Sequence, residues 1–262
     1  MRSSATHGLR SLLDWLGVRY IRKSIHGRVY RVPLRSTSLR RLLRLRDDAY
    51  EGEFYHTVLS LAMEGDTVFD VGAHLGEYTV GFSDVVGEQG RVVAFEANPI
   101  TAAMLQEIVD VNNLQNVRLE ASAVGSRVGC VSLSAQSHSP GQSLLHPSAG
   151  ETCEVRMTTI DSFVREIGLH PDVIKMDVEG YELHVLEGAR DTLRSVGPAL
   201  CVEVHPARLE AAGMSPDAVG ATLLEFGYRT SHRHDHDAIG LRPGAPYDVI
   251  FRKPAPHGGA ST

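Results

Sequence analysis

The chain has 262 residues, of which 42% are hydrophobic, so it is long enough for one packed α/β domain with an extension. No apolar run approaches the roughly 20 residues that a membrane-spanning helix needs, and the N-terminus lacks the apolar core of a secretory signal. Cys130, Cys153 and Cys201 have no metal-type spacing. They are expected to be reduced, mostly buried thiols of a cytoplasmic protein.

The net charge of −6 is unevenly distributed along the chain. Residues 1–46 carry twelve basic residues and one acidic residue, whereas the rest carries 14 basic and 31 acidic residues. A basic arm of this kind can contact nucleic acid, anionic lipid or an acidic partner. Leucines alternate with arginines over 39–46, which favours an amphipathic helix packed on the protein. Because aromatic residues for base stacking are few, a nucleic-acid partner is not expected.

In chain order, the first segments predict a short helix over 9–16 and a hairpin over 20–32. Residues 38–63 predict two helical pieces separated at 51–54. We therefore divide the chain into a basic N-terminal extension (1–64), an α/β domain (65–253) and a disordered tail (254–262).

The α/β domain alternates predicted strands with predicted helices. The strands are 67–71, 91–96, 117–124, 172–177 and 199–204, with a terminal pair at 227–231 and 247–252. The helices are 76–87, 99–113, 159 to about 167, 182–195 and 215–226. Two added strands, 128–134 and 152–158, flank a loop (135–151) that is a candidate active-site lid. The pattern predicts a seven-stranded, mostly parallel, Rossmann-like sheet with helices on both faces, which binds ligands beyond the carboxyl ends of its strands.

A glycine turn containing Gly72 and Gly76 follows the first strand, and Glu96 closes the second strand about twenty residues later. This arrangement is typical of a site for a nucleoside-like cofactor, in which the acid accepts hydrogen bonds from the ribose hydroxyls. His74 stands where a dinucleotide fingerprint could have its middle glycine, which disfavours an NAD-dependent oxidoreductase. Asp70 would repel a pyrophosphate but could pair with an ammonium group. S-adenosylmethionine (SAM) is therefore the expected cofactor.

A second group of polar residues, Asp177, Glu203 and His205, follows the fourth and fifth strands. If these strands neighbour the first, the three side chains converge beside the reactive end of the cofactor. A carboxylate and an imidazole there could deprotonate a hydroxyl acceptor. The same residues could instead bind a divalent metal such as Mg²⁺, or simply pair with each other.

Other polar residues have simpler expected roles. Lys175, inside an apolar strand, is expected to extend outward or to meet an acid across the sheet. Glu182 is expected to cap the following helix, because an acid in the first turn stabilises the N-terminus of a helix. His232, His234 and His236 are expected to lie in a solvated loop.

The segments DVGAHLGEYT, FEANP, IKMDVEGYE and CVEVHP together resemble the FkbM family of SAM-dependent methyltransferases, from about residue 67 to residue 205. The resemblance implies a class I methyltransferase fold and O-methylation of hydroxyls, often on sugars or secondary metabolites. It places Glu96 at the ribose of SAM, and Ala97 and Asn98 near the adenine. The residues that it places near the methionine part of SAM are Asp70, Gly72, Ala73, Gly76 and Tyr78. His74, where such loops more often have Asn, and Ser122 and Ala123, after the third strand, complete the expected cofactor site.

These expectations combine into one mechanism. Asp177 orients the amino group of SAM or the acceptor, and His205, oriented by Glu203, takes the proton of a small-molecule hydroxyl acceptor. The loop with His138, Gln142 and Ser143 closes over the site. The alternative is a non-catalytic module that keeps the fold and docks nucleic acid through the basic arm. The sequence leaves the acceptor and the oligomeric state open.

Overall fold

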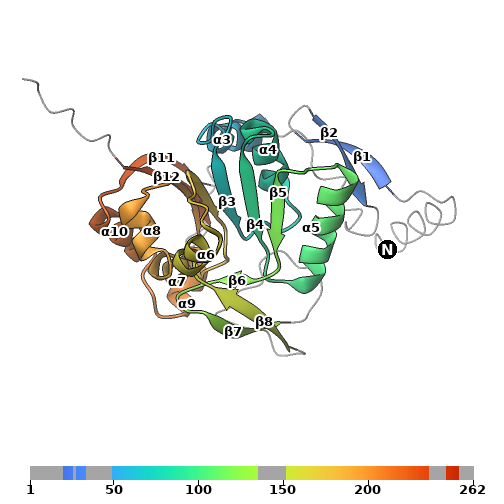
Figure 1. Ribbon diagram of the computed structural model, residues 1–262. Helices are drawn as coiled ribbons and strands as arrows, with labels where there is room; N and C mark the ends of the chain where they lie inside the picture. Colours follow the sequence, from blue (N-terminus) through green and yellow to red (C-terminus); the bar gives the residue numbers. More distant parts are fainter. Residues whose placement is uncertain (1–19, 26–27, 34–48, 135–151, 236–245, 254–262) are drawn as a thin grey trace, which may run out of the picture.

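The computed structural model describes residues 20–25, 28–33, 49–134, 152–235 and 246–253. Its main feature is a seven-stranded sheet in the order β11-β12-β10-β9-β3-β4-β5 (Figure 1). The strands are β3 (Thr67–Val71), β4 (Arg91–Phe95), β5 (Val117–Glu120), β9 (Val173–Met176), β10 (Ala199–Val204), β11 (Arg229–Asp235) and β12 (Tyr247–Arg252). Strand β12 runs antiparallel to both of its neighbours, and the other neighbouring pairs are parallel. The prediction of a mostly parallel, seven-stranded sheet is confirmed.

Helices cover both faces of this sheet because successive strand residues are apolar and point to opposite sides. Val68 packs in one cluster with Phe54 and Phe82, whereas its neighbour Phe69 packs in another with Phe163. The first face carries α3 (Ala49–Leu59), α4 (Glu77–Val86) and α5 (Pro99–Val111). The second carries α6 (Ile160–Ile167), α7 (Glu182–Glu187), α8 (Arg190–Ser195), α9 (Pro206–Ala211) and α10 (Asp217–Glu225). None of the helices in the described ranges is long and apolar enough to cross a membrane.

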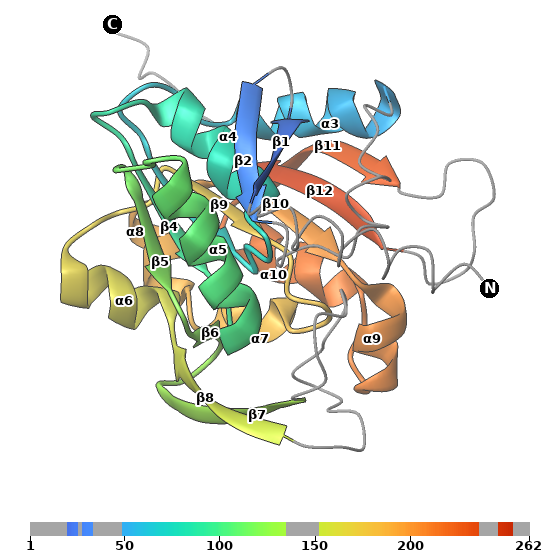
Figure 2. The same cartoon turned by 90° about the vertical axis from the view of Figure 1, so that its right-hand side faces the viewer.

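A second sheet of three strands lies beyond one end of β4 and β5 (Figures 1 and 2). It consists of β6 (Ala123–Val124), β8 (Thr152–Thr158) and β7 (Gly129–Ser134), in that order. The prediction of one strand over 117–124 is wrong, because the chain turns after β5 and then joins the second sheet. The turn is closed by a 2.9 Å hydrogen bond from Ser122 N to Glu120 O. The antiparallel pairing of β7 with β8 agrees with the predicted strand pair.

The described parts of the N-terminal extension pack on the α/β domain. Strands β1 (Tyr20–Ile25) and β2 (Arg28–Pro33) form the predicted hairpin. Asn112, at the end of α5, holds β2 by two hydrogen bonds to the backbone of Arg31, of 2.8 and 2.9 Å. Helix α3 packs on α4, where the Tyr55 hydroxyl donates to Glu77 O. The helix runs through 51–54, so the predicted break there is wrong; buried Phe54, Tyr55 and Val58 explain its continuity.

In the second half of the chain, two further predictions are wrong and one helix was missed. The helix expected over 182–195 is divided into α7 and α8, because Gly188 lies against the backbone of Gly125 and Asp161 accepts hydrogen bonds from the first amides of α8. Helix α9 was not predicted. Strand β11 reaches Asp235, so His232 and His234 are strand residues and not part of a loop.

The three cysteines also differ partly from expectation. All three are free, but Cys201 is buried, Cys153 is half-buried and Cys130 is exposed. The predictions for 9–16, 39–46, His236, the loop 135–151 with His138, Gln142 and Ser143, and the tail 254–262 lie outside the described residues.

Candidate active site

Strand register brings the polar residues of the site to one edge of the sheet. Asp70, Lys175 and Cys201 are aligned across β3, β9 and β10. Because every second residue of a strand points to the same face, Asp177 and Glu203 follow two positions later on that face. The carboxyl ends of β3, β9 and β10 therefore share one polar edge.

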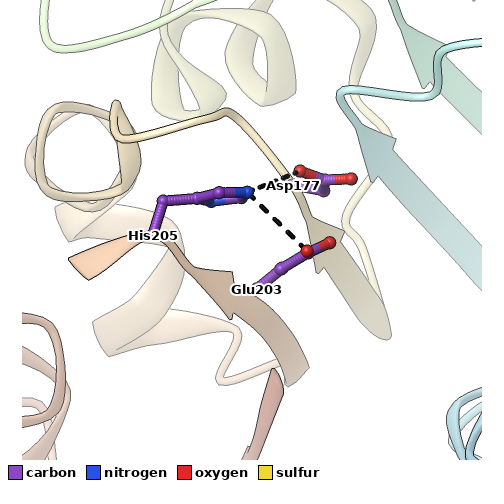
Figure 3. A group of neighbouring side chains, drawn as sticks. All are labelled: Asp177, Glu203 and His205. Carbon is purple, nitrogen blue, oxygen red and sulfur yellow. Dashed lines mark ion pairs between the residues drawn. The ribbon is translucent and has the colours of Figure 1, made fainter. Parts of the chain in front are cut away.

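His205 lies at the centre of this edge, and its side chain is only 6% exposed. Its Nε2 atom is 3.3 Å from Glu179 Oε2, 3.7 Å from Glu203 Oε1 and 3.8 Å from Asp177 Oδ1. Figure 3 shows the ring directed between Asp177 and Glu203. The structure thus brings together the three residues that the sequence grouped, and it adds Glu179.

Glu182 orients the His205 ring, a role that the sequence analysis gave to Glu203. Glu182 is fully buried, and its Oε1 atom lies 2.8 Å from His205 Nδ1 and accepts a 3.0 Å hydrogen bond from Gly180 N. Glu179 and Gly180 both have positive φ, so the turn is tight and returns Glu182 toward the end of β10. Glu182 does stand in the first turn of α7, but its carboxylate serves His205. The available signal was the spacing of the acids at 177, 179 and 182 within the segment IKMDVEGYE.

The four surrounding carboxylates decide the charge of His205. Burial alone would lower the pKa of His205, but the hydrogen bond with Glu182 and the charges of Glu179, Asp177 and Glu203 raise it to about 9. Burial and the neighbouring Asp177 raise the pKa of Glu203 well above its ordinary value. A charged imidazole at neutral pH cannot accept a proton, which bears directly on the expected role of His205.

Lys175 meets two acids, one of the two outcomes expected for it. Its Nζ atom lies 3.6 Å from Asp177 Oδ2, 4.0 Å from Asp70 Oδ1 and 5.0 Å from the centre of the Tyr78 ring. Burial would raise the pKa of Asp177, but Lys175 and His205 outweigh it and lower that pKa. Within the described part of the chain, Asp70 Oδ1 and Asp177 Oδ1 are buried and accept no hydrogen bond. Such oxygens suit a positively charged ligand.

The glycines of the first loop are required by the protein's own packing. Gly72 has φ +82°, and a Cβ atom there would lie 1.8 Å from the carbonyl oxygen of Asp177. Gly76 has φ +81°, and its Cβ would lie 2.4 Å from Leu105 Cδ1. The close approaches of Gly72 to the end of β9 and of Gly76 to α5 require glycine by themselves, and the approach of this loop to a cofactor stays a prediction.

Glu96 links this loop to the next helix. Its two carboxylate oxygens accept hydrogen bonds from His74 N (2.9 Å) and Asn98 N (2.8 Å), and burial raises its pKa to about 7. The Asn98 side chain caps α5 by accepting from Ile100 N. The backbone of His74, in a left-handed conformation, is thereby held against the expected ribose acid.

The remaining expected cofactor residues are placed as follows. Ala73 is buried and its N–H donates to Phe95 O, and Ala97 is half-buried after β4. Tyr78 packs on Tyr55, with ring centres 4.9 Å apart, and therefore faces α3. Ser122 and Ala123 are buried where β6 begins.

The strand order, the reversed strand β12 and the acidic edge define the fold of a class I SAM-dependent methyltransferase. Solved structures share this fold. An FkbM methyltransferase from Methylobacillus flagellatus KT aligns with a TM-score of 0.51 and 21% identity over 80% of this chain, which spans 56% of that chain's length. A putative rRNA-methylase from Clostridium thermocellum aligns with a TM-score of 0.50 and 16% identity, over 78% of this chain and 95% of that one.

The sequence comparisons are more specific. The model of the methyltransferase FkbM domain matches residues 70–230. The hexuronic acid methyltransferase AglP of Haloferax volcanii is 31% identical over 245 residues, which cover 88% of this chain and 95% of that protein. The chain therefore belongs to the FkbM family of SAM-dependent methyltransferases.

Proposed function

We propose that this methyltransferase transfers a methyl group from SAM to a hydroxyl of a sugar, and that a hexuronic acid or its glycoside is the acceptor class to test first. The similarity to a hexuronic acid methyltransferase over almost the whole chain supports a sugar acceptor. The structural observation that carries the choice of a hydroxyl is the group of proton-accepting side chains around His205 Nε2.

Residues at the carboxyl ends of β3, β4 and β9 would hold SAM, which supplies an electrophilic methyl group when bound. Glu96 would accept hydrogen bonds from the ribose hydroxyls, as acids at this position do in nucleoside-binding sites. Asp70, whose buried Oδ1 accepts no hydrogen bond from the described residues, would face the positively charged end. Its other oxygen, Oδ2, accepts a 2.6 Å hydrogen bond from the Thr79 hydroxyl, which holds the carboxylate in place.

A hydroxyl acceptor explains the acidic edge better than a carboxylate acceptor does. A hydroxyl must lose its proton as the C–O bond forms and the S–C bond breaks, with the electron pair returning to sulfur, so an adjacent proton acceptor is useful. A carboxylate acceptor has no such proton to lose, and three acids near the reacting atoms would repel it. The cluster of Asp177, Glu179 and Glu203 therefore favours ether formation over ester formation.

Within this cluster, Glu182 fixes the His205 ring so that Nε2 faces the acceptor. Asp177 and Glu203 flank the same position. Because its neighbours raise the pKa of His205 to about 9, the ring can accept the proton of the hydroxyl at neutral pH only after it has first released its own proton to solvent.

The test is incubation of the protein with ¹³C-methyl SAM and a panel of hexuronic acid glycosides and their reduced, carboxyl-free analogues. We expect a product with a ¹³C methyl ether, which survives mild alkali, and we expect the reduced sugars to react as well. A methyl ester, which alkali cleaves to methanol, would contradict hydroxyl transfer. Labelling of none of the sugars would contradict the sugar acceptor.

Two matched variants test the assignment of the site. Glu203→Gln is expected to abolish transfer, because it removes a carboxylate from the acceptor position. Glu166→Gln, which changes an exposed acid of α6, is expected to retain full activity. Equal activity of the two variants would contradict the assignment.

A further inference from the structure

We propose that Asp177, Glu203 and His205 bind a divalent cation at the acceptor end of the active site. One ligand atom from each side chain lies within 4.8 Å of the others. The three residues come from the ends of two adjacent parallel strands, β9 and β10, whose register fixes their separation. Two carboxylates and one imidazole form a donor set that suits Mn²⁺ or Mg²⁺.

The His205 ring gives an observation independent of the acids. It is nine-tenths buried, and its Nδ1 is already engaged by Glu182 at 2.8 Å. The other ring nitrogen, Nε2, is directed into the space between Asp177 and Glu203 (Figure 3). A histidine whose second nitrogen is held by a carboxylate is the usual arrangement of a metal-binding imidazole.

Asp177 gives a second observation. Its Oδ1 atom is buried and, among the described residues, accepts no hydrogen bond. Its other oxygen, Oδ2, lies 3.6 Å from Lys175 Nζ. A buried carboxylate oxygen that accepts no hydrogen bond is costly, and its ion-pair partner His205 Nε2 is 3.8 Å away, so a cation between Oδ1 and Nε2 would satisfy it.

The local charge balance points the same way. Asp177, Glu179, Glu182 and Glu203 all lie within 4 Å of the His205 ring. Lys175, which also faces Asp70, and Arg208, whose Nε lies 3.0 Å from Glu179, are permanent cations against these acids. Four acids therefore share these two cations and the imidazole, and a divalent ion would add positive charge among them.

The role of the cation rests on the proposed function, although its binding does not. An acceptor hydroxyl bound to the ion would have a lowered pKa, so its proton would leave more readily during methyl transfer. Glu179, which contacts His205 Nε2 and Arg208 without belonging to the proposed ligand set, is positioned to receive that proton.

Binding is tested on the full chain, freed of metal with a chelator and then titrated with Mn²⁺ while the spectrum of free Mn²⁺ is followed by electron paramagnetic resonance. We expect one ion per chain and competition by Mg²⁺. Asp177→Asn, Glu203→Gln and His205→Ala should each weaken Mn²⁺ binding by at least about tenfold. Glu166→Gln should bind as the wild type does. Circular dichroism without metal establishes that each variant is folded, and Glu203→Gln, at a half-buried position, is the mildest change.

The outcomes separate this proposal from the proposed function. A wild-type protein that binds no Mn²⁺, or that binds it equally in all variants, would overturn the cation site. Full methyl transfer to a sugar in excess chelator would also overturn its role while leaving the proposed function intact. Tight, variant-sensitive Mn²⁺ binding without transfer to any sugar would support the site and refute the acceptor.

Discussion

Substituting Gly72 by alanine tests how closely the first loop packs on the end of β9. A Cβ atom at Gly72 would lie 1.8 Å from the carbonyl oxygen of Asp177, and real contacts of this kind stay above 3.0 Å, so the two segments must separate by at least about 1.2 Å. The positive φ costs about 1–2 kcal/mol. Overpacking adds about 1–3 kcal/mol, and loss of the 2.9 Å hydrogen bond from Asp177 N to Val71 O adds about 1 kcal/mol.

Gly65→Ala is the matched control, because Gly65 has φ +89° but no heavy atom of the described residues lies within 4 Å of a Cβ placed there. It therefore carries the conformational cost alone. Urea unfolding should show that Gly72→Ala loses about 2–4 kcal/mol more than Gly65→Ala, the sum of the packing and hydrogen-bond terms. Because Gly72 follows Asp70 in the loop that would hold SAM, SAM binding should weaken in Gly72→Ala and not in the control. Equal destabilisation of the two variants would refute the reasoning.

Three further substitutions test other parts of the account. The raised pKa of Glu96 means that its ionisation costs stability as pH rises from 4.5 through about 7, so Glu96→Gln should gain up to about 3 kcal/mol relative to wild type between pH 5 and pH 8; a constant difference in urea unfolding would contradict this. Lys175→Met leaves the buried Asp70 without its cation and removes one of the two cations near the half-buried Asp177, so it should cost about 3–5 kcal/mol, with partial rescue by a second change, Asp70→Asn. A loss below about 1 kcal/mol in thermal unfolding would contradict that ion-pair role. Asn112→Ala should speed amide exchange in β1 and β2 without affecting β3, and unchanged exchange would show that Asn112 does not hold the hairpin.

The central strands were predictable because their composition leaves few alternatives. Strands such as β3 and β4 are short apolar runs that end at an acid or a glycine turn, and both of their faces are buried. Errors occurred where tertiary contacts override the local pattern. The division between α7 and α8 depends on the contact of Gly188 with the backbone of Gly125, which is about sixty residues away in the sequence. No local sequence pattern predicts that contact.

The candidate site also combines residues that the sequence could place with contacts that it could not. Asp177, Glu203 and His205 follow strand ends, so parallel topology alone brings them to one edge. The partner of His205 could not be identified from local spacing, because Glu182 returns to it only through the tight turn at Glu179 and Gly180. Strand periodicity placed Lys175 on a face, but only the register with Asp70 shows which acid it meets.

The central claim is that the acidic edge of the sheet uses SAM to methylate a hydroxyl, with binding and chemistry on separate residues. Isothermal titration of the wild type and of Glu203→Gln with SAM, followed by methyl-transfer assays on the same samples, tests it most directly. The account predicts one SAM per chain in both proteins, with transfer lost only in Glu203→Gln. Absence of SAM binding by the folded wild type, or undiminished transfer by Glu203→Gln, would contradict it.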